Sequence, residues 1–399
     1  MSFFDPLELL PVDPILGIPA LFAADPRPHK VNLGIGTYKD AEGSPYVLDC
    51  VRDAEAALSL KNLNKEYLPI DGEPKLVKLT EELIFGKPLL NSFSEQIFLT
   101  QTIGGTGALS MGGHLLSQRH SETIYLPNST WPNHKLIFSN SLLKINRYHY
   151  YNEKTHLVDF DRICQEITEM PPESTIVLHV CCHNPTGMDP TNDQWMELSA
   201  LLKKQKIIPF FDFAYQGFKK SVDDDAFPLR YFVSQGHEML VAQSFAKNFG
   251  LYGERVGTLS VVTHSHNSRQ KAASQLKQLM RSHYSTPPRH GAEIIAYILS
   301  SEEAKQGWLI ELGNMRERLK EMRHTLATGL QAKGAHGDWS FLNRQSGFFS
   351  FCGLNESHVH RLIKGYAIYL PVDGRINVGG LNGHNMEYVI DAILDVTQS

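Results

Sequence analysis

Four short apolar runs limit the fold of this chain more than any other feature. They span 175–180, 207–212, 239–243 and 256–262, and each has the length and composition of a buried strand. Between the first two, residues 192–205 place apolar side chains at helical spacing. This β-α-β order predicts an α/β fold with a mostly parallel central sheet flanked by helices. The last two runs are joined by a loop, so one of them can be antiparallel.

A second, smaller α/β domain is expected from the remaining segments. Residues 301–333 have the spacing of one long amphipathic helix, and strand-like segments follow at 348–351 and 376–379. The early strand-like segment 31–38 is expected to pack with them. We therefore predict an N-terminal arm at 1–12, a small domain at 13–44 and 311–399, and a large domain at 45–310.

The charge of the chain excludes some classes of partner. The formal net charge is -5 and no basic stripe is present, which argues against a nucleic acid or an acidic membrane as partner. No apolar run approaches the roughly 18 residues of a membrane span, and the first residues lack the basic region of a signal peptide. The five cysteines are odd in number and scattered, as expected in a reducing compartment. We expect a cytoplasmic protein.

The segment His179-Val180-Cys181-Cys182-His183 is the one place where metal ligands crowd together in the sequence. Adjacent residues of an extended chain point to opposite faces, so these four side chains cannot easily converge on one tetrahedral ion. Their spacing also matches none of the usual zinc patterns. We expect no metal site.

Polar residues follow three of the predicted strands, where an open α/β sheet binds its ligands. His183-Asn184-Pro185-Thr186-Gly187 forms a turn that leaves the Asn184 amide free to donate a hydrogen bond. Asp212-Phe213-Ala214-Tyr215 places a carboxylate close to a phenol, although an aspartate there could also be a helix cap. Lys247 follows the third strand.

These strand ends supply what pyridoxal phosphate needs. The Lys247 amine can join the cofactor aldehyde covalently, and the ring then draws electrons from the α-carbon of an amino acid. A carboxylate such as Asp212 keeps the ring nitrogen protonated. Donors such as Asn184 and Tyr215 stabilise the anion of the ring oxygen. On this interpretation Lys247, Asp212 and Tyr215 are the catalytic residues.

The cofactor phosphate requires amide groups at a helix start, hydroxyl groups and a fixed cation. Gly104-Gly105-Thr106-Gly107-Ala108 opens a helical pattern, and Ser244 and Arg255 add a hydroxyl and a bidentate cation. A dinucleotide-binding loop is the rival interpretation of the glycines. Neither G-x-G-x-x-G after a strand nor G-x-x-x-x-G-K-[ST] occurs in the sequence.

With these motifs in view, the sequence resembles the aspartate aminotransferase family nearly from end to end. This family is subgroup I of the class I, fold-type-I pyridoxal-phosphate enzymes, and it includes the bacterial aromatic amino acid aminotransferases. The strings that carry the resemblance are Asp13-Pro14-Ile15-Leu16, Val31-Asn32-Leu33-Gly34-Ile35-Gly36, Gly104 to Ala108, Trp131-Pro132-Asn133-His134, Cys181 to Gly187, Asp212 to Phe218, Gly253-Glu254-Arg255-Val256-Gly257 and Asn377-Val378-Gly379-Gly380.

The resemblance implies roles that the residues alone do not assign. Trp131 would stack on the cofactor ring and, with Asn184, would also contact the substrate. Arg375 would bind the substrate α-carboxylate, and Gly36 would belong with it to a small domain that closes over the substrate. Tyr67 would reach the cofactor phosphate of the neighbouring subunit, and Arg281 would reach across a homodimer to a second carboxylate.

The activity implied is a ping-pong transamination between L-aspartate or L-glutamate and 2-oxoglutarate or oxaloacetate. The released Lys247 amine would act as the general base. Transamination of tyrosine or phenylalanine is the alternative within the family. A non-catalytic binding protein and a pyridoxal-phosphate enzyme that catalyses β-elimination or decarboxylation also stay open. Thr37 and Ala246 depart from the common family pattern, where an apolar residue and a serine are usual.

Overall fold

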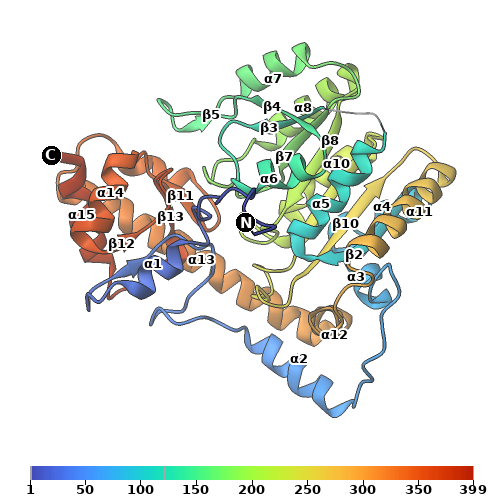
Figure 1. Ribbon diagram of the computed structural model, residues 1–399, viewed down its shortest axis with the longest axis horizontal. Helices are drawn as coiled ribbons and strands as arrows, with labels where there is room; N and C mark the ends of the chain where they lie inside the picture. Colours follow the sequence, from blue (N-terminus) through green and yellow to red (C-terminus); the bar gives the residue numbers. More distant parts are fainter. Residues whose placement is uncertain (1, 120–122, 399) are drawn as a thin grey trace.

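The computed structural model describes residues 2–119 and 123–398 and shows one large and one small lobe (Figure 1). A seven-stranded sheet forms the centre of the large lobe, in the order β2-β10-β9-β8-β7-β3-β4. Its strands are β2 (Ile97–Ile103), β3 (Thr123–Pro127), β4 (Lys144–Tyr148), β7 (Thr175–His179), β8 (Ile208–Phe213), β9 (Met239–Ser244) and β10 (Val256–Val262). β10 is antiparallel to both of its neighbours, and the other pairs are parallel. The predicted mostly parallel sheet is confirmed.

Helices cover both faces of this sheet (Figure 1). Successive strand residues point to opposite faces, so Phe210 packs with one set of helices and Phe211 with the other. The large-lobe helices are α2 (Asp49–Leu60), α3 (Pro74–Phe85), α4 (Lys87–Phe93), α5 (Gly104–Ser117), α6 (Asn133–Asn140), α7 (Phe160–Glu169), α8 (Asn192–Gln205), α9 (Val222–Asp225), α10 (Phe227–Ser234), α11 (His266–His283) and α12 (His290–Ser300). The middle strands β7, β8, β9 and β10 are therefore buried on both faces, which explains why they are apolar runs rather than alternating patterns, whereas the edge strand β4 is only partly buried.

Local sequence fixes the ends of α8, the helix predicted at 192–205. The Thr191 hydroxyl accepts the backbone N–H of Gln194, and the Gln194 side chain accepts the backbone N–H of Thr191. This reciprocal capping satisfies two backbone groups that a helix start leaves without partners. Lys206 ends the helix in the left-handed conformation.

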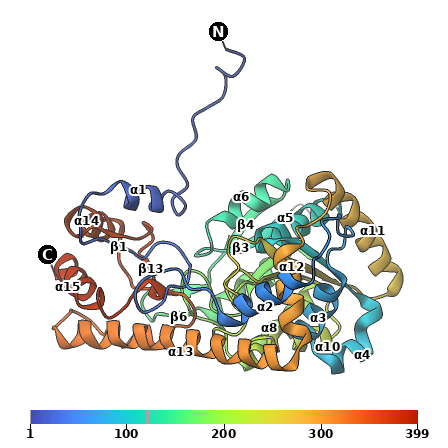
Figure 2. The ribbon, with the colours of Figure 1, turned by 90° about the horizontal axis from the view of Figure 1, so that it is seen from below.

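The small lobe joins both ends of the chain. It contains α1 (Ile18–Ala24), β1 (Val31–Asn32), β11 (Phe349–Phe351), α14 (Glu356–Tyr366), β12 (Ile368–Tyr369), β13 (Arg375–Asn377) and α15 (Met386–Gln398). β1 pairs with β12 in parallel, and β11 pairs with β13 in antiparallel fashion. Helix α13 (Glu302–Ala332) runs along one side of the molecule and packs against both lobes (Figure 2).

Two of the segments predicted as strands, 31–38 and 376–379, form shorter strands in the structure. Only Val31–Asn32 of the segment 31–38 is a strand, because beyond the hydrogen bond from Leu33 N–H to the Tyr369 carbonyl the segment leaves β12, and the carbonyl groups of Leu33, Ile35 and Thr37 accept from Asn377. The segment 376–379 turns after Asn377 into a 3₁₀ turn, Val378–Gly380. Ile35, Gly36 and Thr37 of the first segment line the cavity between the lobes, where loops rather than strands commonly form a ligand site.

Residues 2–12 extend away from both lobes (Figure 2). They carry exposed apolar side chains, namely Phe3, Phe4, Leu7, Leu9, Leu10 and Val12. The division into an arm, a small domain and a large domain at the predicted boundaries stays a prediction. Among the described helices, none has the length and apolarity needed to cross a membrane.

Candidate active site

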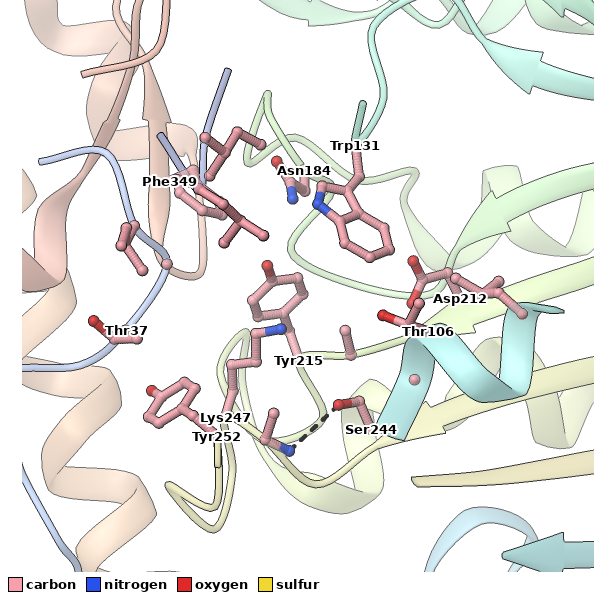
Figure 3. Close-up of a pocket in the computed structure, with 18 of the residues that line it drawn as sticks. Thr37, Thr106, Trp131, Asn184, Asp212, Tyr215, Ser244, Lys247, Tyr252 and Phe349 are labelled. Atoms are coloured by element: carbon pink, nitrogen blue, oxygen red, sulfur yellow. Dashed lines mark hydrogen bonds between the residues drawn. The ribbon is translucent and has the colours of Figure 1, made fainter. Parts of the chain in front are cut away.

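A cavity of about 240 Å³ lies between the lobes, at the carboxyl ends of β7, β8 and β9 (Figure 3). The large lobe contributes the start of α5 and the loops after these strands, and the small lobe contributes residues beside Gly36 and Arg375. Most of the predicted site residues line this one cavity. They are Gly36, Gly105, Thr106, Trp131, Asn184, Asp212, Tyr215, Ser244, Lys247, Arg255 and Arg375.

Lys247 follows β9 and directs its amine into the cavity (Figure 3). Burial of the amine and the nearby Arg255 lower its pKa to about 8, although the charge of Asp212 acts in the opposite direction. The ammonium lies 5.2 Å from the centre of the Tyr215 ring. A lysine in these surroundings releases its proton more readily than a lysine in water, as a nucleophile or a general base requires.

Asp212 lies inside strand β8 and is therefore not a helix cap. Its Oδ2 bonds to His134 Nε2 at 3.0 Å, and the chain continues from His134 Nδ1 through the Thr130 hydroxyl to His179 Nε2. Burial alone would raise the pKa of Asp212, but the hydrogen bond from His134 and nearby positive charge outweigh it and lower the pKa. The cavity thus contains a buried, ionised carboxylate.

Asn184 and Tyr215 approach the cavity from neighbouring loops. The Asn184 Oδ1 accepts a hydrogen bond of 2.6 Å from Arg375 Nη1, which orients the amide nitrogen for a ligand. Burial raises the pKa of Tyr215, so its hydroxyl keeps its proton and remains a donor.

Two glycines open a space beside Ser244 and Arg255 at the start of α5. A Cβ at Gly105 would lie 2.9 Å from the Ser244 Cβ, and one at Gly104, whose φ is +66°, would lie 2.5 Å from Arg255 Nη2. No side chain caps this helix start among the described residues. Free amides, a hydroxyl and a guanidinium together form a site for a phosphate group, and this cradle fits pyridoxal phosphate.

Arg375 is a buried cation on the small-lobe side. Its side chain is 1% exposed, and its guanidinium lies over the Phe349 ring at 4.7 Å. The nearest carboxylate is Asp373, at 3.9 Å from Nε, and within the described residues Nε has no hydrogen-bond partner. A buried guanidinium with unused donors is suited to bind a carboxylate of a ligand.

Two predicted site residues lie outside the cavity of the single chain. Tyr67 is 85% exposed, and Arg281 is exposed on α11, where it donates to the Ser285 hydroxyl. Neither lines the cavity. Their assignment to the active site of a neighbouring subunit stays a prediction.

The structure adds cavity residues that the sequence analysis did not assign. Leu16, Tyr252 and Phe349 line the cavity together with Ile15, and His134 supports Asp212 from behind. Ile15, Leu16 and His134 stand in strings that carry the family resemblance, which is a signal that could have found them. Tyr252 directly precedes the string Gly253-Glu254-Arg255-Val256-Gly257, which is a signal of the same kind. Phe349 occurs in a segment with no such signal, and only the tertiary contacts reveal it.

Within the described residues, one cluster has the geometry for a metal ion, and it is formed by His134, His179 and Asp212. Its atoms already bond to one another and to Thr130. Cys181 contacts the carbonyl oxygen of Tyr215 instead of joining this cluster.

Comparison with known proteins supports a specific family. Residues 28–393 match the family described as aminotransferase class I and II. The chain is 44% identical to aspartate aminotransferase 1 of Medicago sativa, covering 98% of this chain and 94% of the relative. It is 42% identical to the aspartate aminotransferase of Escherichia coli, covering 98% and 100%. A crystal structure of aromatic-amino-acid aminotransferase from Burkholderia pseudomallei, covalently bound to pyridoxal phosphate, superposes with a TM-score of 0.96 at 40% identity over 100% of both chains.

Proposed function

Because the chain belongs to the aminotransferase class I and II family, we propose that it transfers amino groups between L-aspartate or L-glutamate and oxaloacetate or 2-oxoglutarate. The observation that carries the proposal is the meeting of three groups in one cavity: the Lys247 amine, the ionised Asp212 and the buried Arg375. The cofactor is pyridoxal phosphate, which supplies an aldehyde and an electron-withdrawing ring to the substrate α-carbon.

The residues around the cavity would hold the cofactor from several sides. Asp212, kept ionised by His134, would hold the ring nitrogen in its protonated form. Asn184 and Tyr215 would donate to the ring oxygen, and Trp131 would cover one face of the ring. The phosphate would bind Gly105, Thr106, Ser244 and Arg255, and the partner subunit would add Tyr67.

Lys247 would move the proton that transamination requires. Its Nζ would accept the proton that leaves the substrate α-carbon and would give a proton back later in the same transfer, while the bound cofactor would supply the electron-withdrawing ring. Because the pKa of this amine is lowered to about 8, a larger share of it is uncharged near neutral pH than of a lysine in water. One 2-oxo acid leaves before the next enters, so the same lysine serves both halves of the ping-pong cycle.

The substrate carboxylates would bind two arginines. Arg375 would bind the α-carboxylate with its paired donors, next to Gly36 on the small lobe. Movement of the small domain would bring Arg375 and Gly36 toward the substrate and exclude water. Arg281 of a second subunit would bind the side-chain carboxylate, which selects dicarboxylic amino acids.

A homodimer with shared active sites follows from these assignments. The exposure of Tyr67 and Arg281 and the apolar side chains of the extended arm support it, because apolar surface of this kind is usually covered by a partner. We further propose a cytoplasmic location, which the five free cysteines favour.

Transamination of aromatic amino acids is the second candidate function, and the similarity to the Burkholderia pseudomallei enzyme favours it. A substrate panel on the wild type beside Lys247→Ala tests both candidates. We expect oxo acid formation with a larger kcat/KM for aspartate than for phenylalanine. Lys247→Ala is expected to fold and bind the cofactor while losing nearly all turnover.

The outcomes of this panel separate the alternatives. A large preference for phenylalanine would replace the dicarboxylate proposal with the aromatic one. Failure to bind pyridoxal phosphate would indicate a non-catalytic binding protein. Loss of aspartate without the matching oxo acid would indicate elimination or decarboxylation. Turnover retained by Lys247→Ala would overturn the role of the lysine.

A further inference from the structure

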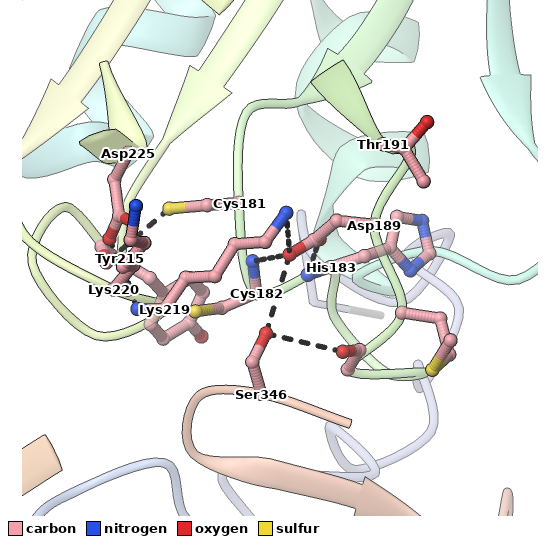
Figure 4. Close-up of polar contacts among 12 residues, drawn as sticks. Cys181, Cys182, His183, Asp189, Thr191, Tyr215, Lys219, Lys220, Asp225 and Ser346 are labelled. Carbon is pink, nitrogen blue, oxygen red and sulfur yellow. Dashed lines mark hydrogen bonds and ion pairs between the residues drawn. The ribbon is translucent and has the colours of Figure 1, made fainter. Parts of the chain in front are cut away.

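A buried carboxylate outside the cavity lies where three site-forming loops meet (Figure 4). It belongs to Asp189, whose side chain is 1% exposed. Asp189 Oδ2 accepts the backbone N–H of Cys182 and Oδ1 accepts that of His183, both at 2.9 Å. These two amides directly precede Asn184. The carboxylate therefore closes the loop that presents Asn184 to the cavity.

The second contact of Asp189 comes from the loop that carries Tyr215. Lys219 Nζ lies 3.3 Å from Asp189 Oδ2. A second buried carboxylate, Asp225, fixes this loop by accepting the backbone N–H groups of Gly217, Lys219 and Lys220 at 2.9 to 3.0 Å. The ion pair thus joins two loops that both present a hydrogen-bond donor to the cavity.

The third contact comes from the small-lobe side. The Ser346 hydroxyl lies 3.3 Å from Asp189 Oδ2, and the Ser346 backbone N–H donates to the Gly187 carbonyl at 2.8 Å. Ser346 stands three residues before Phe349, whose ring lies under Arg375. Arg375 in turn donates to Asn184. The contacts that start at Asp189 and pass through Ser346 and Arg375 therefore lead back to the loop of Asn184, at one edge of the cavity.

We propose that Asp189 is a positioning residue for Asn184. We propose also that its ion pair with Lys219 keeps the side chains of Asn184 and Tyr215 in fixed positions relative to Arg375. The proposal rests on the proposed function, since it assigns Asn184 and Tyr215 to the cofactor and Arg375 to the substrate. Each oxygen of Asp189 accepts one of the two amides before Asn184, an arrangement in which both side-chain atoms must be acceptors. An asparagine at 189 would turn one donor toward an N–H group and displace the loop.

Three variants of the holoenzyme test this proposal. Asp189→Asn removes the second acceptor, and Lys219→Met removes the paired charge while keeping the length of the side chain. Lys220→Met is the matched control, because Lys220 is exposed and pairs with the exposed Asp224. The measurements are KM and kcat for aspartate and the pH midpoint of the absorbance of the bound cofactor, taken without substrate on folded protein.

We expect Asp189→Asn to raise KM for aspartate about tenfold or more, since small displacements of positioning groups have effects of this size. The absorbance midpoint should move to higher pH, because donors to the ring oxygen stabilise its anion. Lys219→Met should change both quantities in the same direction by a smaller factor, and Lys220→Met should change neither. A merely structural role would lower thermal stability without moving the midpoint.

Unchanged KM and midpoint in Asp189→Asn would overturn the proposal. If that variant does not fold, Lys219→Met decides, and wild-type values in it would overturn the proposal as well. Failure of the proposed function is a separate result: the wild type would form no oxo acid, while the absorbance midpoint, which needs no substrate, would still report on Asp189.

Discussion

Burial changes what the amine of Lys247 can do. A lysine in water keeps its proton far above neutral pH, but the surroundings of Lys247 lower its pKa to about 8. The shift combines opposing effects, since burial and Arg255 lower the pKa while Asp212 raises it. At the scale of single residues, the chemistry of the site is thus set by neighbours that lie far apart in the sequence.

A titration of the apoprotein follows from this arrangement. Only the uncharged amine reacts with an aldehyde, so reductive modification of Lys247 should increase with pH around a midpoint of about 8. Asp212→Asn removes the negative charge that raises this pKa, so the midpoint should fall. Quantifying the modified Lys247 peptide by mass spectrometry over a pH series measures both values.

Asp193→Asn serves as the control for this titration. Asp193 is an exposed carboxylate at the start of α8 and does not line the cavity. Its removal should leave the midpoint where it is. A midpoint that stays near 8 in Asp212→Asn would show that the two charges do not interact.

At the scale of elements, the start of α5 and strand β10 approach each other so closely that Gly257 has no room for a side chain. A Cβ there would lie 2.5 Å from the carbonyl carbon of Gly104 and 2.6 Å from the Gln243 carbonyl oxygen. Both contacts are backbone atoms, which cannot rotate away. The absence of a side chain at Gly257 therefore allows the start of α5 to pack closely against the sheet beside Ser244 and Arg255.

We expect Gly257→Ala to lower the free energy of unfolding by roughly 1–3 kcal/mol, the range for overpacked interiors. It should also weaken binding of pyridoxal phosphate more than binding of pyridoxal, since the displaced element is the phosphate cradle. Thermal unfolding and parallel titrations with the two compounds measure these effects. Gly253→Ala, at a glycine with no atom within 4 Å of its Cβ position, should change neither.

The elements with a strong local pattern were predictable. The range 192–205 coincides with α8 because its apolar spacing and its capping residues agree. The four apolar runs became β7, β8, β9 and β10. The segment 31–38 was less regular than its pattern, because the carbonyl groups of Leu33, Ile35 and Thr37 accept hydrogen bonds from Asn377, at the end of β13, and form no regular strand ladder.

At the scale of the whole molecule, the cavity of one chain contains only some of the proposed site residues. Lys247, Asp212 and Arg375 line the cavity of the same chain, whereas Tyr67 and Arg281 point into solvent. If both reach a neighbouring subunit, each active site contains residues of two chains. The exposed arm, with its apolar side chains, would then pack on the partner.

Mixing two inactive variants tests this arrangement. Lys247→Ala lacks the base of its own site, and Arg281→Ala lacks the arginine that it gives to its partner. A hybrid dimer has one site with neither defect, so unfolding and refolding an equal mixture should restore about a quarter of wild-type activity. Activity is measured with aspartate and 2-oxoglutarate. A mixture as inactive as its components would show that Arg281 serves the site of its own chain, and wild-type activity of Arg281→Ala alone would show that it serves no site.

The sequence by itself determined the α/β architecture and the chemical types gathered at the strand ends. Apolar spacing, helix caps and glycine turns act over a few residues, so Asn184, Asp212 and Lys247 could be placed at the ends of three predicted strands without knowledge of distant contacts. The tertiary structure alone decided their electrostatic state. The pKa of Lys247, the ionisation of Asp212 through His134 and the junction of loops at Asp189 depend on burial and on partners brought together from remote segments.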